Sequence, residues 1–257
     1  MTKNEISIQV GGMSQSGSTL LYNIVRLLLE INTSNTTDST ITHRLHKDHT
    51  RCPGFDYYIV SLRDIRDTTL SWMLKEGIKN VNEINIDPLF SRTEELRDDE
   101  LVYTLNGIVR HITDNIMWLQ QYNHIPETNS ENTYFWGYEK YKMHPVEETR
   151  ALVSFLKLNV DLYPRETLER VVNEAEGLIE HAPAAADGMT PKEAAWNDKT
   201  KMLKIQRTAN KGRSGHWGQY MEPWLLTFLQ TLVMGFLLDY GYATLRCPHC
   251  NKNPRKP

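Results

Sequence analysis

Cysteine is scarce in this chain: its 257 residues contain only Cys52, Cys247 and Cys250. So few cysteines argue against a disulfide framework and favour a reducing compartment. Residues 1–10 lack the basic-then-apolar order of a signal peptide, so we expect a cytoplasmic protein. A strong excess of one charge is missing too, because the net charge is −3. That balance gives no electrostatic reason to expect a nucleic-acid partner or an anionic membrane surface.

A hydrophobic run long enough to cross a membrane is also missing. Residues 223–238 carry no charge, but they fall short of the roughly 20 residues that a spanning helix needs. Thr227, Gln230 and Thr231 dilute the run, and Asp239 ends it. We therefore expect a buried helix packed on a sheet and no membrane partner.

Apolar and polar residues alternate in a way that predicts strands followed by helices. With 40% hydrophobic residues, the chain has enough apolar side chains for a sizeable core. Strands are expected at residues 6–10, 39–42, 57–62 and 133–138. Helices are expected at residues 18–31, 68–75, 99–122, 145–158 and 166–179. Alternating strands and helices indicate an α/β fold, one domain over residues 1–245 with a central parallel sheet flanked by helices. Residues 246–257 are expected to form a short basic tail.

Residues 11–19 follow the first strand and read Gly-Gly-Met-Ser-Gln-Ser-Gly-Ser-Thr. A Gly/Ser-rich turn between a strand and a helix directs backbone N–H groups and the positive helix end at one point, which suits a phosphate. Gly12 and Gly17 have the spacing of the nucleotide-binding P-loop, but Ser18 stands where that motif has lysine. A plain tight turn is the alternative interpretation.

A second stretch, residues 63–71, follows the strand at 57–62 and reads Arg-Asp-Ile-Arg-Asp-Thr-Thr-Leu-Ser. It places Arg63 at a strand end and Ser71 after the strand-to-helix turn that follows, which suits a second phosphate. A ligand with phosphates at two separated points explains both stretches.

With these two stretches the chain resembles the sulfotransferases that use 3′-phosphoadenosine-5′-phosphosulfate (PAPS), which have a P-loop-like fold. Residues 14–21 are similar to the family loop Pro-Lys-Ser-Gly-Thr-Thr-Trp-Leu, and residues 63–71 are similar to Arg-Asp-Pro-Arg-Asp-x-x-x-Ser, departing only at Ile65. Residues 210–217 echo a late family element, Arg-Lys-Gly-x-x-Gly-Asp-Trp. Tyr138-Glu139 and the helix after it echo a fourth element. The four elements occur in family order across most of the chain.

The resemblance implies in-line transfer of the sulfuryl group from PAPS to a hydroxyl or amine of a small-molecule acceptor. The product would be 3′-phosphoadenosine 5′-phosphate (PAP), and no metal is expected, because arginine, lysine and helix dipoles supply the electrostatics. The residues implied in donor binding are Gln15, Ser16, Gly17, Ser18, Thr19, Arg63, Ser71, Tyr138, Lys211, Gly212 and Arg213.

Three departures from the family pattern bear on activity. Gln15 stands where the family has a lysine or arginine that reaches the bridging oxygen of the phosphosulfate, and a glutamine cannot neutralise charge. Asn210 replaces the first basic residue of the late element. The family's Lys-Thr-His element is reduced to Ile41-Thr42-His43. A catalytically silent PAP-binding relative is therefore the main alternative.

His43 matches the family's histidine in that element, so we expect it to be the base that removes the acceptor proton, with Gln15 near the leaving oxygen. His46 and Lys47 are reserve candidates for the base. The alternative is a solvated loop with incidental histidines.

Further rival classes are a P-loop nucleotide kinase, which lacks its lysine here, and a partner-binding domain without nucleotide. In the tail, Cys247-Pro-His-Cys250 looks like half a zinc site. His249 and Cys52 are possible additional ligands, but their spacing does not support a site, so no metal is expected.

Overall fold

The structure is a computed structural model that describes residues 4–35, 41–75, 105–123, 131–180, 215, 217, 221 and 223–242. The chain divides into two compact units, Met1–Leu62 with Trp118–Arg207, and Arg63–Met117 with Thr208–Pro257. The expected tail, residues 246–257, lies outside the described residues.

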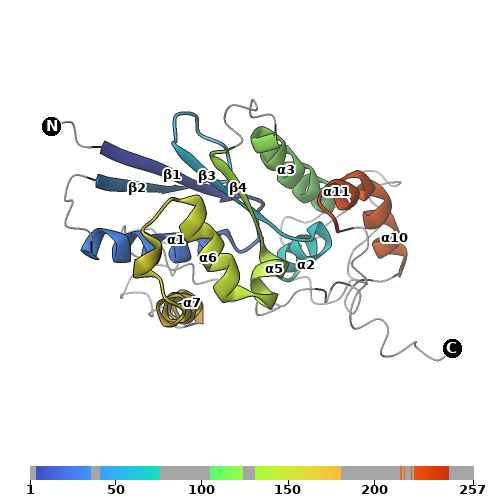
Figure 1. Cartoon of the computed structure of the whole chain (residues 1–257). Helices are drawn as coiled ribbons and strands as arrows, with labels where there is room; N and C mark the ends of the chain where they lie inside the picture. Colours follow the sequence, from blue (N-terminus) through green and yellow to red (C-terminus); the bar gives the residue numbers. More distant parts are fainter. Residues whose placement is uncertain are drawn as a thin grey trace, which may run out of the picture. The chain divides into compact units, whose positions relative to one another are not determined.

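The first unit contains a four-stranded parallel sheet in the order β2-β1-β3-β4 (Figure 1). Its strands are β1 Asn4–Gly12, β2 Ile41–Lys47, β3 Tyr57–Leu62 and β4 Thr133–Gly137. The expected α/β class with a parallel sheet flanked by helices is confirmed. Successive strands add first on one side of β1 and then on the other, so the order reverses beside β1. Ligands of such sheets bind at the carboxyl ends of the strands where the order reverses.

Helices of the first unit cover one face of the sheet. They are α1 Ser18–Asn35, α5 Tyr138–Met143, α6 Pro145–Phe155 and α7 Arg165–Glu180, with a 3₁₀ turn at Val160–Leu162. α1 contacts β1, β2 and β3, and α6 and α7 pack on α1 (Figure 1). Because α1 has neighbours on several sides, its apolar residues are buried almost throughout its length.

Strand register decides which side chains meet α1. Ile8 and Val10 are almost fully buried in the same core as α1, together with Ile59 and Trp136 of β3 and β4. Since side chains alternate between the faces, Gln9 and its register partner on β2, His46, point to the opposite face. On β4, Tyr134 packs against Phe155 of α6 at a ring separation of 5.3 Å.

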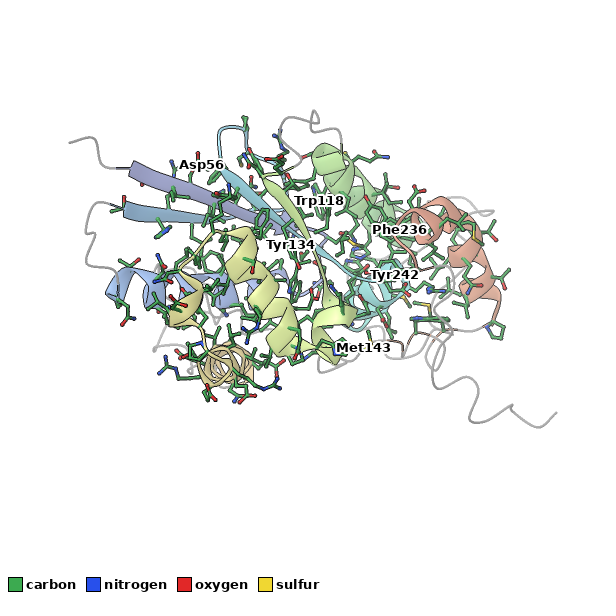
Figure 2. All side chains as sticks on the ribbon, in the orientation of Figure 1. Asp56, Trp118, Tyr134, Met143, Phe236 and Tyr242 are labelled. Atoms are coloured by element: carbon green, nitrogen blue, oxygen red, sulfur yellow. The ribbon has the colours of Figure 1, made fainter. Side chains whose placement is uncertain are left out.

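The second unit includes α2 Ile65–Lys75, most of α3 Leu105–Asn123, α10 Pro223–Leu232 and α11 Met234–Asp239. The single helix expected at residues 223–238 is interrupted at Val233, and Leu238 is 63% exposed. Phe236 stacks on Tyr242 with ring centroids 6.2 Å apart (Figure 2). Among the helices described, none is both long and apolar enough to cross a membrane.

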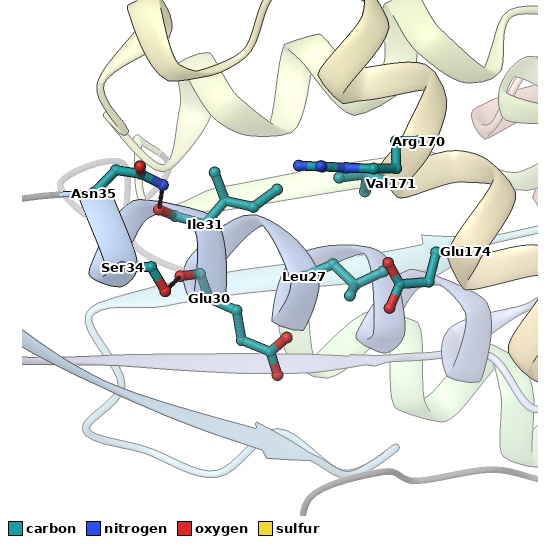
Figure 3. A pocket seen from close by; sticks show the side chains of 8 residues that line it. All are labelled: Leu27, Glu30, Ile31, Ser34, Asn35, Arg170, Val171 and Glu174. Carbon is teal, nitrogen blue, oxygen red and sulfur yellow. Dashed lines mark hydrogen bonds between the residues drawn. The ribbon is translucent and has the colours of Figure 1, made fainter.

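A shallow pocket lies between α1 and α7 (Figure 3). Its lining begins at Leu27, nine residues after α1 starts, which is about 13 Å along the helix. Its lining mixes charged residues, Glu30, Arg170 and Glu174, with apolar and uncharged polar ones. The pocket is therefore separate from the strand ends, where the fold predicts ligand binding.

Candidate functional site

The loop between β1 and α1 has a backbone shaped for an anion. Gly12, Gln15 and Gly17 have φ values of 106°, 61° and 84°, all in the left-handed region. Left-handed residues next to a helix start turn successive N–H groups toward one point and form a concave anion site. The sequence prediction of a phosphate-binding turn therefore has a backbone that suits it.

Ser16 fastens this loop to the neighbouring strand. Its buried hydroxyl group lies 2.5 Å from the Met13 carbonyl oxygen and 2.5 Å from the Ser61 hydroxyl of β3, and its one hydrogen can be donated to either of them. Ser61 in turn donates to the Gly11 carbonyl at 3.0 Å. The Ser16 side chain thus has a structural part, and its backbone N–H is the group available for the predicted phosphate.

Gly12 allows the loop to approach β3 closely. A Cβ atom at this position would meet the backbone carbonyl and N–H of Ser61, and its φ of 106° strains any L side chain. We therefore expect Gly12→Ala to lower the free energy of unfolding by at least about 3 kcal/mol. Gly235→Ala is the matched control, because nothing lies within 4 Å of a Cβ there and alanine favours a helix. Chemical denaturation of both variants measures the difference, and equal stabilities would refute the close approach.

Two side chains from the end of β2 reach the loop. Lys47, which is in register with Val10, donates from Nζ to the Thr19 hydroxyl at 2.7 Å. His49 places Nδ1 2.8 Å from the Gly12 carbonyl oxygen, and its ring stacks on Trp118 of α3 at 4.9 Å. A carbonyl oxygen only accepts, so Nδ1 carries the hydrogen and a neutral His49 keeps its lone pair on Nε2. The geometry thus places an ammonium group and an imidazole beside a loop whose backbone suits an anion.

The sequence predicts His43, and not His49, beside the phosphate loop. His43, the expected base, lies in β2 opposite Ile6, four residues or about 13 Å before Lys47. The structure therefore does not bring His43 to the loop. Of the reserve candidates, Lys47 reaches the loop, whereas His46 points to the opposite face and stacks on Phe55. The usable signal was the spacing Lys-x-His, which is present as Lys47-Asp48-His49 at the end of the strand.

His43 has a different consequence, for stability. Burial lowers the pKa of His43 below its usual 6.5, and its buried Nδ1 has no hydrogen-bond partner among the described residues. The unfolded chain binds this proton more readily than the folded chain, so stability is retained above about pH 6.5 and falls as the pH drops through that value. We expect His43→Gln to make the fall in Tm between about pH 7.5 and pH 5.5 shallower. Calorimetric melting across that range tests this, and an unchanged slope would contradict it.

Tyr138 packs directly on the loop. A Cβ at Gly17 would lie 2.5 Å from its ring, so glycine is required for this contact. The ring is buried, and Trp136 meets it edge-on at 6.1 Å. Two other loop residues are predicted to bind the sulfuryl donor PAPS. Ser18 is buried at the start of α1, and Gln15 is partly exposed.

In the second unit, the Arg63 and Ser71 side chains lie within hydrogen-bond distance of each other. The Arg63 guanidinium is buried and donates from Nη1 to the Ser71 hydroxyl at 3.2 Å. Arg63 directly follows β3, and Ser71 lies in α2. A buried guanidinium beside a hydroxyl suits a phosphate oxygen.

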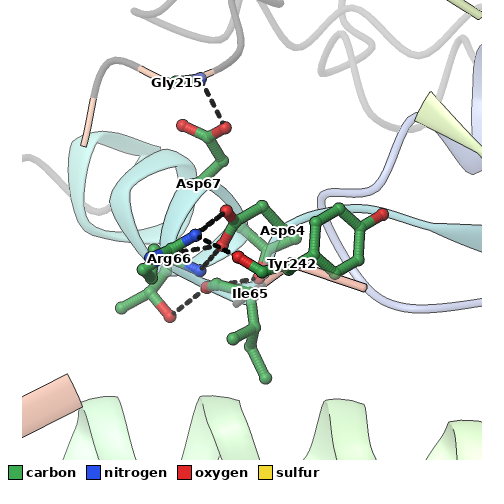
Figure 4. Close-up of polar contacts among 8 residues, drawn as sticks. Asp64, Ile65, Arg66, Asp67, Gly215 and Tyr242 are labelled. Carbon is green, nitrogen blue, oxygen red and sulfur yellow. Dashed lines mark hydrogen bonds and ion pairs between the residues drawn. The ribbon is translucent and has the colours of Figure 1, made fainter. Parts of the chain in front are cut away.

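The other charged residues of the same motif hold the late part of the chain. Arg66 forms a bidentate ion pair with Asp64, and its guanidinium lies 4.2 Å from the Trp217 ring centroid. Asp67 accepts a hydrogen bond from the Gly215 N–H at 2.7 Å, and desolvation raises the pKa of its carboxyl group (Figure 4). Lys211, Gly212 and Arg213, predicted to bind the donor, lie outside the described residues.

Comparisons with known proteins support the fold. No family model and no curated protein matches the sequence. The structure is similar to a mouse sulfotransferase, SULT7A1, complexed with PAP, with a TM-score of 0.55 and 14% identity over 95% of this chain and 87% of the other. Retinol dehydratase in complex with androsterone and the inactive cofactor PAP has a TM-score of 0.52 and 13% identity over 97% of this chain and 84% of the other. The complex of retinol dehydratase with retinol and PAP has a TM-score of 0.51 and 13% identity over 96% of this chain and 84% of the other. At these identities the similarity shows that the chain has a sulfotransferase-like fold.

Proposed function

We propose that this protein is a sulfotransferase that moves the sulfuryl group from PAPS to a hydroxyl or amine of a small molecule and releases PAP. The observation that carries the proposal is the pair of contacts from the end of β2, Lys47 to Thr19 and His49 to Gly12. They supply a cation and an oriented base at a loop whose backbone suits a phosphate. The fold of the PAP-bound neighbours supports the same assignment.

Lys47 supplies the positive charge that Gln15 does not provide at the loop. The loop lacks the family's own cation at position 15, yet the Lys47 ammonium group lies within hydrogen-bond distance of Thr19 in the first turn of α1. As the bond from sulfur to the phosphate oxygen breaks, negative charge grows on that oxygen, and a nearby ammonium group stabilises it. Gln15 donates a hydrogen bond there without charge.

The proton leaves the acceptor by way of His49. The acceptor oxygen or nitrogen attacks sulfur, its proton moves to His49 Nε2, and the bridging oxygen departs with PAP. The hydrogen bond to Gly12 and the stacking on Trp118 keep the ring in one orientation through this step. We propose His49 for this role in place of His43, because His43 lies mid-strand.

The remaining donor contacts follow from the motifs. The N–H groups of residues 16–19 would hold the 5′-phosphate, Arg63 with Ser71 the 3′-phosphate, and Tyr138 the adenine side. Lys211, Gly212 and Arg213 would also bind the 3′-phosphate. In support, two residues that follow them closely in the sequence contact the 63–71 motif: Gly215 donates a hydrogen bond to Asp67, and the Trp217 ring lies beside Arg66.

For the acceptor we propose a small molecule and no nucleic-acid or membrane partner. Retinol dehydratase, one of the structural neighbours, was solved with androsterone and with retinol, and the chain itself shows no strong charge excess. The cytoplasm is the proposed location, because cysteine is scarce.

Release of PAP from PAPS in the presence of a panel of phenols, alcohols and amines tests the activity. We expect at least one acceptor to accelerate PAP release and to gain a sulfuryl group by mass spectrometry. The second candidate, a silent PAP-binding relative, is favoured by Gln15. It predicts PAP binding without transfer, and it predicts that Gln15→Lys switches transfer on.

A further inference from the structure

Three side chains near the end of β2 and in the loop after it bring metal-binding atoms together. An imidazole nitrogen of His46, a carboxylate oxygen of Asp48 and Sγ of Cys52 all lie within 4.8 Å of one another. Sγ and His46 Nε2 are 4.0 Å apart. Cys52 is a free thiol and not part of a disulfide.

The donor types and spacing suit zinc. Zinc binds sulfur at about 2.3 Å and nitrogen or oxygen at about 2.0–2.2 Å, so ligands of a tetrahedral site stand about 3.3–3.8 Å apart. The present separations need only small side-chain movements to reach that geometry. A thiolate, an imidazole and a carboxylate together match the preferences of Zn²⁺ better than those of Mg²⁺ or Ca²⁺.

The backbone that carries the thiol is already fixed. Gln9, fully buried in β1, accepts from the Cys52 N–H at 2.9 Å and donates to the Thr50 carbonyl at 2.6 Å. The Tyr58 hydroxyl donates to the Cys52 carbonyl at 3.0 Å. One oxygen of Asp48 accepts from the Thr50 N–H at 2.9 Å, which leaves the other oxygen for a ligand. Such supporting contacts orient metal ligands in known sites.

A buried polar group beside the cluster points to a missing ligand. Tyr122 is 1% exposed, and its hydroxyl group has no hydrogen-bond partner among the described residues. It lies near Asp48, because a Cβ atom at Gly11 would meet both the Tyr122 hydroxyl and the Asp48 carbonyl oxygen. An unsatisfied buried hydroxyl is unfavourable, and a thiolate or a metal-bound water supplies the acceptor that it lacks.

We propose that His46, Asp48 and Cys52 bind one zinc ion with water in the fourth position. The proposed ligands alternate along the chain with the groups of the proposed active site. His46 and Asp48 would bind the metal, whereas the side chains of Lys47 and His49 reach the β1–α1 loop. Zinc would therefore fix the segment that carries Lys47 and His49. Zinc binding itself does not depend on the proposed sulfuryl transfer.

Titration of the full chain with zinc, in competition with a chromophoric chelator, tests this site. We expect one zinc per chain at His46, Asp48 and Cys52, with an affinity that falls at least about 100-fold in Cys52→Ser and in Asp48→Asn. Asp48 is exposed, so its substitution tests binding in a chain that keeps its fold. Cobalt in place of zinc should give a thiolate-to-metal charge-transfer band that Cys52→Ser abolishes.

The double variant Cys247→Ser/Cys250→Ser is the matched control, because those tail cysteines are the other thiols in the chain. It should retain the zinc and the charge-transfer band. Zinc lost in this double variant but kept in Cys52→Ser would overturn the proposal. So would the absence of zinc binding by the unmodified chain at micromolar free zinc.

Discussion

Replacing His49 by asparagine is expected to slow sulfuryl transfer by about 10²–10⁴-fold, the usual contribution of a general base, while leaving PAP affinity nearly unchanged. Asparagine keeps an N–H group that can donate to the Gly12 carbonyl, so the loop retains that contact. It has no basic nitrogen to take the acceptor proton. Initial rates of PAP release with the fastest acceptor measure the loss, and calorimetry with PAP measures binding.

His43→Gln is the matched control for this experiment, because His43 lies on the same strand but four residues before Lys47. It should turn over at close to the normal rate. A near-normal rate in His49→Asn combined with a large loss in His43→Gln would restore His43 as the base and reject His49.

Replacing Arg63 by alanine is expected to weaken PAP binding by about 100-fold, since hydrogen bonds to a charged group contribute about 1.5–3 kcal/mol. The buried guanidinium lies beside Ser71 and suits the 3′-phosphate, a group that 5′-AMP does not have. The affinity for 5′-AMP should therefore change little. The PAP affinity of Arg63→Lys should lie between those of the unmodified protein and Arg63→Ala, because lysine keeps the charge but loses the planar set of hydrogen-bond donors.

Calorimetric titration of each variant with PAP and with 5′-AMP separates these outcomes. Arg110→Ala is the control, as this arginine of α3 has an 85% exposed side chain and should not affect either nucleotide. Equal losses of PAP and 5′-AMP affinity in Arg63→Ala would show that Arg63 does not read the 3′-phosphate.

The strands with continuous apolar runs were predictable from the sequence. β3 has the expected bounds, Tyr57–Leu62, because both of its faces are covered and its residues read as one apolar run. β1 contains the expected run and extends beyond it on both sides. The turn after β1 and the Arg63–Ser71 pair were likewise visible, since glycine spacing and a strand-end arginine are local signals.

β2 was displaced in the prediction, so His43 was expected just after the end of the strand, whereas it lies within it. The strand was expected at residues 39–42 but runs over Ile41–Lys47, where Thr42, Arg44 and His46 alternate with Ile41, His43 and Leu45. A polar edge strand of this kind has little hydrophobic signal. The contact between Lys47 and Thr19 joins residues 28 positions apart, and only the register of β2 on β1 reveals it.

The break at Val233 was also missed. Residues 223–238 were expected to form one helix because they carry no charge, yet Thr231, Val233 and Gly235 have low helix propensity and follow one another closely. Composition alone does not show where such a run ends and restarts.

The central claim is that this chain binds a nucleotide that carries both a 3′- and a 5′-phosphate. Thermal unfolding with PAP, 5′-AMP and Mg-ATP in parallel tests it. A ligand at a hundred times its Kd adds about 2.7 kcal/mol, which corresponds to roughly 5–10 °C for a chain of this size. We predict that PAP raises Tm by that amount, that 5′-AMP raises it less, and that Mg-ATP has little effect. No shift with PAP, or an equal shift with Mg-ATP, would contradict the sulfotransferase account.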